Sequence, residues 1–262
     1  MTAAAELRER VRRYYTAYYR DALGIADWPV LVDLRQEEER QEAARLERLA
    51  RLVGPAALDG RVLNVGCGTG GFDGALGRAR PGTRVTGIDA DAEAMSICAL
   101  KRGAGAGGFA RAVSEALPFR DGAFDLVYCF SAIEHVASVA ATVREMVRVT
   151  RPGGAVYVHT PNAWSWYEGH YKLFWVPFLP RALARWYLRL RGRPPAYVDT
   201  IRRLTPTQLA RAFAAAGVSE LRFHDDAPPR ESRGPLWRLL RLYYQLTGTA
   251  AFIELVARVP AR

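Results

Sequence analysis

Short apolar runs alternate with helical patterns through the middle of the chain. The apolar runs predict seven strands, at residues 61–66, 84–89, 109–113, 123–130, 155–160, 218–223 and 251–259. Helical composition occurs between them at residues 71–80, 91–102, 134–150 and 205–216. Strands that alternate with helices form parallel sheets covered on both faces. The pattern therefore predicts an α/β fold with a doubly wound, mostly parallel, seven-stranded sheet.

Two segments lie outside this alternation. Residues 1–58 have mostly helical patterns, clearest at 37–53, and residues 161–204 form an aromatic-rich insert. Open sheets of this class bind ligands at the carboxyl ends of their strands, and we expect both segments to cover that edge. The prediction is one domain with a helical N-terminal cap at 1–58, a ligand-binding core at 59–160, a lid insert at 161–204 and the rest of the core sheet at 205–262.

Composition narrows the class of protein. The chain has 262 residues, of which 50% are hydrophobic and 24% charged, which excludes collagen-like and low-complexity proteins. Its three cysteines lack the spacing of a disulfide framework or a metal site. No apolar run is long enough to span a membrane, and charges interrupt the N-terminus where a signal peptide needs an apolar core. We therefore expect a cytoplasmic protein.

The positive charge is concentrated in one segment. The whole chain carries a formal charge of +10, and residues 161–204 hold eight basic and two acidic side chains, a net +6. A basic patch this local favours an acidic surface or an anionic partner over a general affinity for nucleic acid.

One glycine-rich turn indicates a cofactor site. Residues 62–71 read VLNVGCGTGG, an apolar strand that enters a turn through Gly66, Gly68 and Gly70. Glycines let such a turn adopt positive φ and approach a ligand closely. Asp89 ends the next strand, 23 residues after Gly66, where a carboxylate can accept hydrogen bonds from both ribose hydroxyls. This Rossmann-like arrangement accommodates NAD or S-adenosylmethionine.

Later segments separate these two ligands. EALPF at 115–119, AFDLVYC at 123–129, EHV at 134–136 and RPGG at 151–154 follow in that order. The series resembles class I S-adenosylmethionine-dependent methyltransferases, and within them the ubiquinone-pathway O-methyltransferases. The resemblance implies S-adenosyl-L-methionine as cofactor. It also implies these cofactor-binding residues: Arg45, Gly66, Cys67, Gly68, Gly70, Asp89, Ala90, Ser114 and Phe130. Arg48 competes with Arg45 for the place near the cofactor carboxylate.

The chain departs from this family at three positions. Asn64 replaces the usual acidic residue of the first motif, and Val113 stands where an aspartate often meets the adenine amine. Recognition of adenine then falls to backbone groups or Ser114. Ser131 replaces a glutamate seen in the quinone methyltransferases, and we therefore expect no metal site.

Histidines are the candidates for the chemistry of the acceptor. Methyl transfer to a hydroxyl benefits from a general base. His170, inside the insert, is the first candidate, and His135, beside Glu134 at the start of the expected helix 134–150, is the second.

The insert suggests a hydrophobic acceptor. It holds nine of the chain's 28 aromatic residues within 24 positions, at residues 164, 166, 167, 171, 174, 175, 178, 186 and 187. Arg181, Arg185 and Arg189 share one helical face, with Leu183, Trp186, Tyr187 and Leu190 on the other side. Such a helix can rest on an anionic membrane or dock its apolar face on the domain, and the sequence leaves both open.

The sequence thus predicts a methyltransferase that acts on a hydroxyl of a small hydrophobic or lipid-linked acceptor. An RNA methyltransferase, suggested by the charge, and an NAD-dependent oxidoreductase, suggested by the glycine-rich turn, are the alternatives. Nucleic acid is the less favoured partner, because the motif of amino-group DNA methylases is absent after residue 130. Peripheral membrane contact and the oligomeric state stay open.

Overall fold

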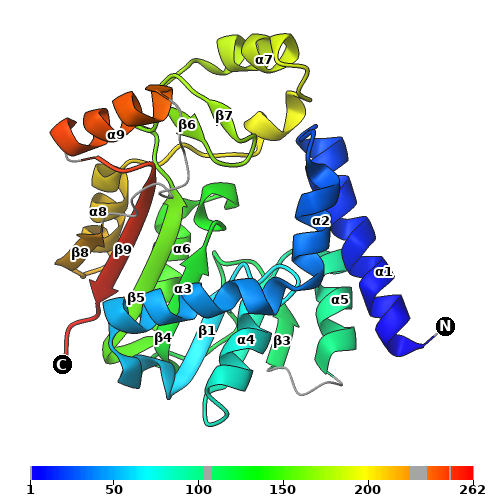
Figure 1. The fold of residues 1–262 in the computed structure, drawn as a ribbon. Coiled ribbons are helices and arrows are strands. Elements are labelled where there is room, and N and C mark those ends of the chain that lie inside the picture. The colour runs from blue at the N-terminus through cyan, green and yellow to red at the C-terminus, as the bar shows by residue number, and fades with distance from the viewer. Residues whose placement is uncertain (1, 103–107, 225–234, 248, 262) are drawn as a thin grey trace.

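A seven-stranded sheet forms the centre of the molecule (Figure 1). The computed structural model describes residues 2–102, 108–224, 235–247 and 249–261. The strands lie in the order β3 (Gly108–Arg111), β2 (Arg84–Asp89), β1 (Arg61–Val65), β4 (Phe124–Phe130), β5 (Thr150–Pro161), β9 (Phe252–Arg258) and β8 (Glu220–His224). Strands β1 to β5 pair in parallel, and β9 runs antiparallel to both neighbours. The predicted α/β, doubly wound, mostly parallel sheet is confirmed.

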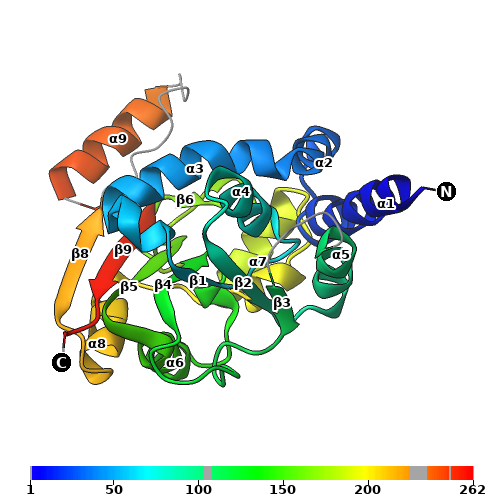
Figure 2. The same cartoon turned by 90° about the horizontal axis from the view of Figure 1, so that it is seen from below.

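Alternate side chains of the strands pack into two apolar layers. In β4, Val127 and Cys129 face α6 (Val139–Val149) and α8 (Pro206–Ala215), whereas Leu126 and Tyr128 face α3 (Glu38–Val53) and α4 (Gly71–Ala79). Helix α5 (Ala92–Arg102) lies beside β2 and β3 (Figure 2). A strand buried on both faces needs the nearly continuous apolar sequence seen here.

The chain reverses its direction of progress across the sheet between β1 and β4. From β1 it proceeds outward to β2 and β3, then returns to β4 on the other side of β1. The loops after β1 and β4 therefore diverge and leave a crevice at the carboxyl edge, which is the usual ligand site of such sheets.

The N-terminal segment and the insert meet above this edge. Helix α1 (Ala3–Thr16) continues in a π-helical segment at Ala17–Ala22, and α2 (Trp28–Gln36) and a short 3-10 helix at Pro55–Leu58 flank α3. The insert forms a small hairpin of β6 (Tyr167–Glu168) and β7 (Leu173–Phe174), then α7 (Arg181–Leu190) and a 3-10 helix at Ala196–Asp199. One buried cluster contains Tyr15 and Leu23 from the first segment and Tyr171 and Leu188 from the second. The two segments therefore pack on each other.

The expected helix 134–150 begins later than predicted. Ile133–His135 form a separate 3-10 helix, and α6 starts after Ser138, whose hydroxyl accepts a hydrogen bond from the Ala141 amide. The Glu115 carboxylate accepts the amides of Ala137 and Ser138, which holds this segment outside the helix. His135 consequently ends a short 3-10 helix after β4 and does not lie at the start of a long helix.

Helix α9 (Pro235–Thr247) completes the described elements and lies near the hairpin of the insert (Figure 1). Among the described residues, no helix combines the length and apolar character needed to cross a bilayer.

Candidate active site

The glycine-rich turn lies at the crevice between β1 and β4. Gly66, Gly68 and Gly70 all have positive φ, at 75°, 52° and 78°. A Cβ on Gly66 would lie 2.2 Å from the Cβ of Ala132, and one on Gly70 would lie 2.8 Å from the ring of Phe109. A Cβ on Gly68 would have no atom of the described residues within 4 Å. Gly66 and Gly70 therefore let the turn pack against its neighbours, and Gly68 is the glycine that faces open space.

Asp89 links the turn to the end of β2. One carboxylate oxygen accepts the Gly68 amide at 2.9 Å, and the other accepts the Asp91 amide at 2.9 Å. The side chain is half-buried, so its remaining lone pairs can accept ribose hydroxyls. Ala90 follows as an exposed residue whose carbonyl accepts Arg111 Nε at 3.0 Å. The role of Asp89 as a ribose ligand stays a prediction.

The side chain of Cys67 belongs to the floor of the turn. It is buried, and a Cβ on Gly87 would lie 2.9 Å from its sulfur. The neighbouring Cys98 thiol donates to the Gly68 carbonyl at 3.3 Å. Cys67 can therefore reach a ligand above the turn only through its backbone.

The two candidate arginines occupy different environments. The guanidinium of Arg45 lies 3.9 Å from the ring centroid of Phe130 and pairs with buried Glu42 at 2.5 Å. Arg48 pairs with Glu254, whose side chain is 1% exposed. Since Phe130 ends β4 at the carboxyl edge, Arg45 is the arginine that lies beside the expected cofactor site. Arg48, with a side chain 36% exposed, is the cation that pairs with buried Glu254.

The hydroxyl of Ser114 points toward neighbouring protein side chains. The oxygen lies 3.0 Å from Thr142 Oγ1 and donates to Glu115 at 3.2 Å. Val113 beside it is 51% exposed. Because the Ser114 hydroxyl is engaged in these contacts, the backbone of this segment is better placed than that hydroxyl to contact an adenine ring.

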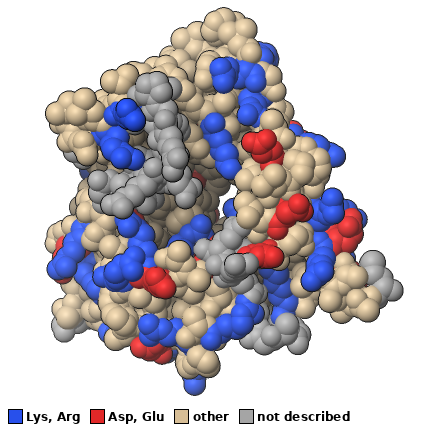
Figure 3. Space-filling view, viewed as in Figure 1, with Lys and Arg blue, Asp and Glu red and all other residues tan. Residues whose placement is uncertain are grey.

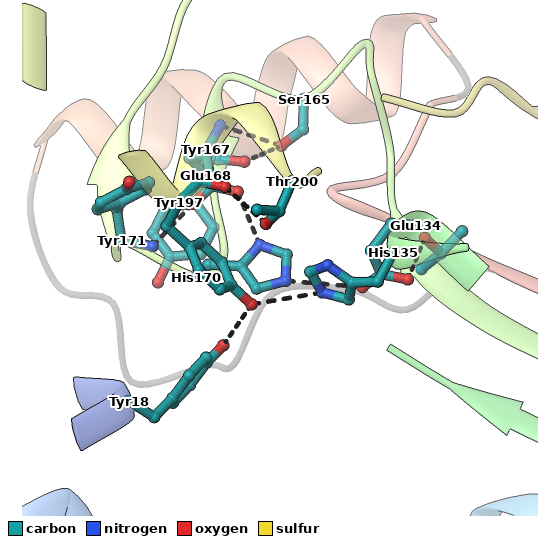
Figure 4. A network of polar contacts seen from close by, with 11 residues as sticks. Tyr18, Glu134, His135, Ser165, Tyr167, Glu168, His170, Tyr171, Tyr197 and Thr200 are labelled. Carbon is teal, nitrogen blue, oxygen red and sulfur yellow. Dashed lines mark hydrogen bonds and ion pairs between the residues drawn. The ribbon is translucent and has the colours of Figure 1, made fainter. Parts of the chain in front are cut away.

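A second group of polar side chains surrounds His170 (Figure 4). His170 Nδ1 lies 2.9 Å from Glu168 Oε1, and its Nε2 forms a 3.6 Å ion pair with Glu134 Oε1. Glu134 is fully buried and also accepts the Thr160 hydroxyl at 2.9 Å. Glu168 also accepts the Tyr171 amide at 2.7 Å. Core and insert therefore each contribute one carboxylate to His170.

The two histidines have opposite charge preferences. Burial alone would lower the pKa of His170, but its contacts with Glu134 and Glu168 outweigh this effect and raise the pKa to about 9. Desolvation by burial lowers the pKa of His135 below its ordinary value. The charge of Glu134 opposes this shift, and the charge of His170 adds to it. At neutral pH His170 is an imidazolium and His135 a neutral imidazole.

Two tyrosines connect His135 to the segments above it. His135 Nε2 lies 3.4 Å from the Tyr197 hydroxyl, which donates to the Tyr18 hydroxyl at 3.2 Å. The rings of His135 and His170 are 5.4 Å apart between centroids. Desolvation raises the pKa of both tyrosines, so they are protonated at neutral pH. The face seen in Figure 3 is hollowed near its centre, where N-terminal helices, insert and sheet edge meet in Figure 1.

Among the described residues, Glu134, His135 and His170 offer ligand atoms within 4.8 Å of one another. That spacing would suit one metal ion, yet both ring nitrogens of His170 already face carboxylates. The two carboxylates favour the protonated form of the ring, and a protonated imidazole has no lone pair for a metal.

Sequence reasoning missed the partners of the histidines. Glu168 stands two residues before His170, a spacing that could have pointed to the pair. Tyr18 and Tyr197 are separated by 179 residues, and no sequence signal joins them.

Comparisons with known proteins indicate the family of the chain. Residues 63–158 match the family model described as "Methyltransferase domain". The ubiquinone biosynthesis O-methyltransferase of Bordetella avium is 30% identical over 81% of this chain and 80% of its own length. The ubiquinone/menaquinone biosynthesis C-methyltransferase of Rubrivivax gelatinosus is 30% identical over 84% of this chain and 83% of its own length. The Sodalis glossinidius O-methyltransferase is 37% identical over 45% of this chain, which spans about half (48%) of that relative.

Solved structures share the fold at low identity. Phosphoethanolamine N-methyltransferase 2 of Haemonchus contortus, in complex with S-adenosyl-L-methionine, has a TM-score of 0.56 at 17% identity over 83% of this chain and 52% of that chain. The [4+2]-cyclase SpnF has a TM-score of 0.54 at 22% identity over 82% of this chain and 81% of that chain. A cyclase among these neighbours means that the fold alone does not determine the reaction.

Proposed function

Because this chain belongs to the class I S-adenosylmethionine-dependent methyltransferases, we propose that it methylates a hydroxyl of a small hydrophobic or lipid-linked acceptor. The observation that carries the proposal is a neutral His135 at the carboxyl edge of the sheet, 5.4 Å between ring centroids from the imidazolium of His170. The names of the relatives support a small-molecule acceptor. They include both O- and C-methyltransferases, so the acceptor atom is argued from the site itself.

S-adenosylmethionine is the cofactor, and it supplies an electrophilic methyl group on a sulfonium. Asp89 would hold the ribose hydroxyls, and the backbone at Gly68 would pass close beneath the cofactor. Arg45 would lie near the cofactor carboxylate, and Phe130 beside the bound molecule. Two features suit this ligand. The turn has open space at Gly68, and Asp89 keeps lone pairs that do not accept a backbone amide.

His135 acts as the general base in this proposal. A neutral imidazole can accept a hydroxyl proton at neutral pH, whereas His170, with a pKa of about 9, is already protonated. His170 was the first candidate from the sequence, and we propose for it an electrostatic role. Its positive charge disfavours protonation of free His135 and favours negative charge on the acceptor oxygen.

Aromatic side chains make the surroundings suitable for an apolar acceptor. Tyr18 and Tyr197 pack edge to face at 5.6 Å between ring centroids, and Tyr197 also contacts both histidines. The two hydroxyls bond to each other, and that of Tyr197 also contacts His135, so mostly ring surface is left to meet a ligand.

The test combines product analysis with a histidine series. The purified protein and S-adenosylmethionine are incubated with a lipid and metabolite extract, and products that gain one methyl group (about 14 mass units) are identified. We expect an O-methyl group by NMR. For the product found, His135→Asn should lower kcat roughly 10²–10⁴-fold, with little change in cofactor affinity. His224→Asn, a histidine on β8 at the far edge of the sheet, is the matched control. A methyl group on carbon or nitrogen, or an unchanged kcat in His135→Asn, would overturn the proposal.

A second proposal concerns access for a lipid-linked acceptor. Ala184 and Leu188 of α7 are buried against the molecule, whereas Leu183, Trp186 and Leu190 are 52%, 60% and 64% exposed. The apolar side chains of α7 therefore fall into two groups, one buried and one exposed. The exposed stripe consists of Leu183, Trp186 and Leu190, at positions i, i+3 and i+7. We propose that this stripe rests on an anionic bilayer, with its flanking arginines near the lipid headgroups.

Charge supports this assignment of α7. Arg181 and Arg189 are exposed, and Arg185 pairs with Asp199 at 2.7 Å. Basic side chains near an anionic membrane each contribute about 1 kcal/mol. Co-sedimentation with phosphatidylglycerol vesicles should fall strongly in the triple change of Leu183, Trp186 and Leu190 to Gln. Val30→Gln, a 60% exposed residue on α2, should leave it unchanged. Equal binding by both variants would contradict the proposal.

A further inference from the structure

A buried carboxylate lies beneath the glycine-rich turn. Asp73, in the first turn of α4, has no exposed surface. Its Oδ2 accepts a 2.6 Å hydrogen bond from the side-chain amide of Asn64, which is 3% exposed on β1. The pair therefore joins the strand before the turn to the helix after it.

The packing around Asp73 defines where the carboxylate points. A Cβ on Gly87 of β2 would lie 2.7 Å from Asp73 Oδ1 and 2.9 Å from Cys67 Sγ. The carboxylate thus lies against the backbone of β2 and next to the side chain of Cys67, on the protein side of the turn. The proximity of this negative charge also contributes to the raised pKa of the Cys67 thiol, after the Cys98 contact and desolvation.

In this pair the strand supplies the amide and the helix supplies the carboxylate. The family resemblance implies an acidic residue at position 64, where this chain has an amide, and here a carboxylate from α4 meets that amide. We propose that Asp73 supplies the fixed negative charge that position 64 lacks, and that it is a positioning residue for the cofactor turn. The inference rests on the family's cofactor and not on the proposed acceptor.

The consequence concerns which ligand the site prefers. S-adenosylmethionine carries one more positive charge than its demethylated product, S-adenosylhomocysteine. A fixed anion close behind the turn attracts the sulfonium form more strongly, because a charge in a protein interior is less screened than one in water. Asp89, on the ligand side of the turn, accepts hydrogen bonds from two backbone amides, and its remaining lone pairs are expected to accept the ribose hydroxyls. The charge of Asp73 therefore favours the methylated cofactor over the product.

A structural role alone would behave differently. An acidic residue in the first turn of a helix stabilises that helix through its dipole, whichever ligand is bound. Loss of such a role would lower the stability of the protein or weaken both ligands equally. The ratio of the two affinities separates the explanations.

Calorimetric titration of the full chain with each ligand tests the inference. Asp73→Asn should weaken S-adenosylmethionine about tenfold more than S-adenosylhomocysteine. The exchanged variant Asn64→Asp/Asp73→Asn should restore the wild-type affinity ratio, since it returns the charge to the strand. Glu93→Gln, which removes an exposed acid from the first turn of α5, is the matched control.

Two outcomes would overturn the inference. One is an Asp73→Asn protein that binds both ligands with the wild-type ratio, and the other is an exchanged variant whose ratio is not restored. If Asp73→Asn does not fold, as judged by its thermal melting curve, the exchanged variant decides the matter by itself. Failure to bind either ligand in the wild-type protein would instead contradict the cofactor assignment.

Discussion

Replacement of His170 by glutamine should make the stability of the protein less dependent on pH. The folded-state pKa of about 9, against an ordinary value of 6.5, corresponds to about 3 kcal/mol of stabilisation by the protonated ring. Because the folded pKa is raised, this contribution is complete below about pH 6.5 and is lost as the pH rises through about 9. Glutamine has nearly the same length and can still donate to Glu168, but it carries no charge between Glu168 and Glu134.

Urea titrations at about pH 6, 7.5 and 10 measure this effect in the cofactor-free protein. The variant should be about 3 kcal/mol less stable than wild type at pH 6, and the difference should shrink toward zero at pH 10. His224→Gln should follow the wild-type curve at all three pH values. A difference between wild type and His170→Gln that is the same at every pH would mean that the ring is neutral in the folded protein, and the charge assignment would be wrong.

Three further predictions concern other parts of the site and its support. Asp89→Ala should weaken S-adenosylmethionine binding by about 1–3 kcal/mol in calorimetry, because the ribose hydroxyls lose a charged acceptor; an unchanged affinity in a folded variant would remove Asp89 from the site. Arg48→Met should cost about 3–5 kcal/mol in urea unfolding, because it leaves Glu254 buried without its cation. Glu254→Gln added to it should recover most of that loss, and the absence of recovery would contradict the ion-pair argument. Activity should survive treatment with EDTA, since His170 is bonded as an imidazolium, and loss of activity restored by added metal would refute this.

The sequence by itself determined the fold and the place of the glycine-rich turn. Strands buried on both faces need continuous apolar runs, such as AFDLVYCF before residue 131, and these can be read without the structure. The positions of the glycine-rich turn and Asp89 were also predictable. They follow the two neighbouring parallel strands β1 and β2, whose ends lie together at one edge of the sheet. The predicted start of α6 was wrong because the Glu115 carboxylate, about twenty residues away in the sequence, accepts hydrogen bonds from the amides just before the helix.

Only the tertiary structure decided the charges and partners of the side chains around His135 and His170. Both histidines were candidates from the sequence, but their pKa values depend on burial and on carboxylates from separate segments, Glu134 after β4 and Glu168 in the insert. The contact between Tyr18 and Tyr197 likewise joins segments 179 residues apart. Electrostatic energy depends on distance through space and on exclusion of water, and neither quantity is encoded in the local order of residues.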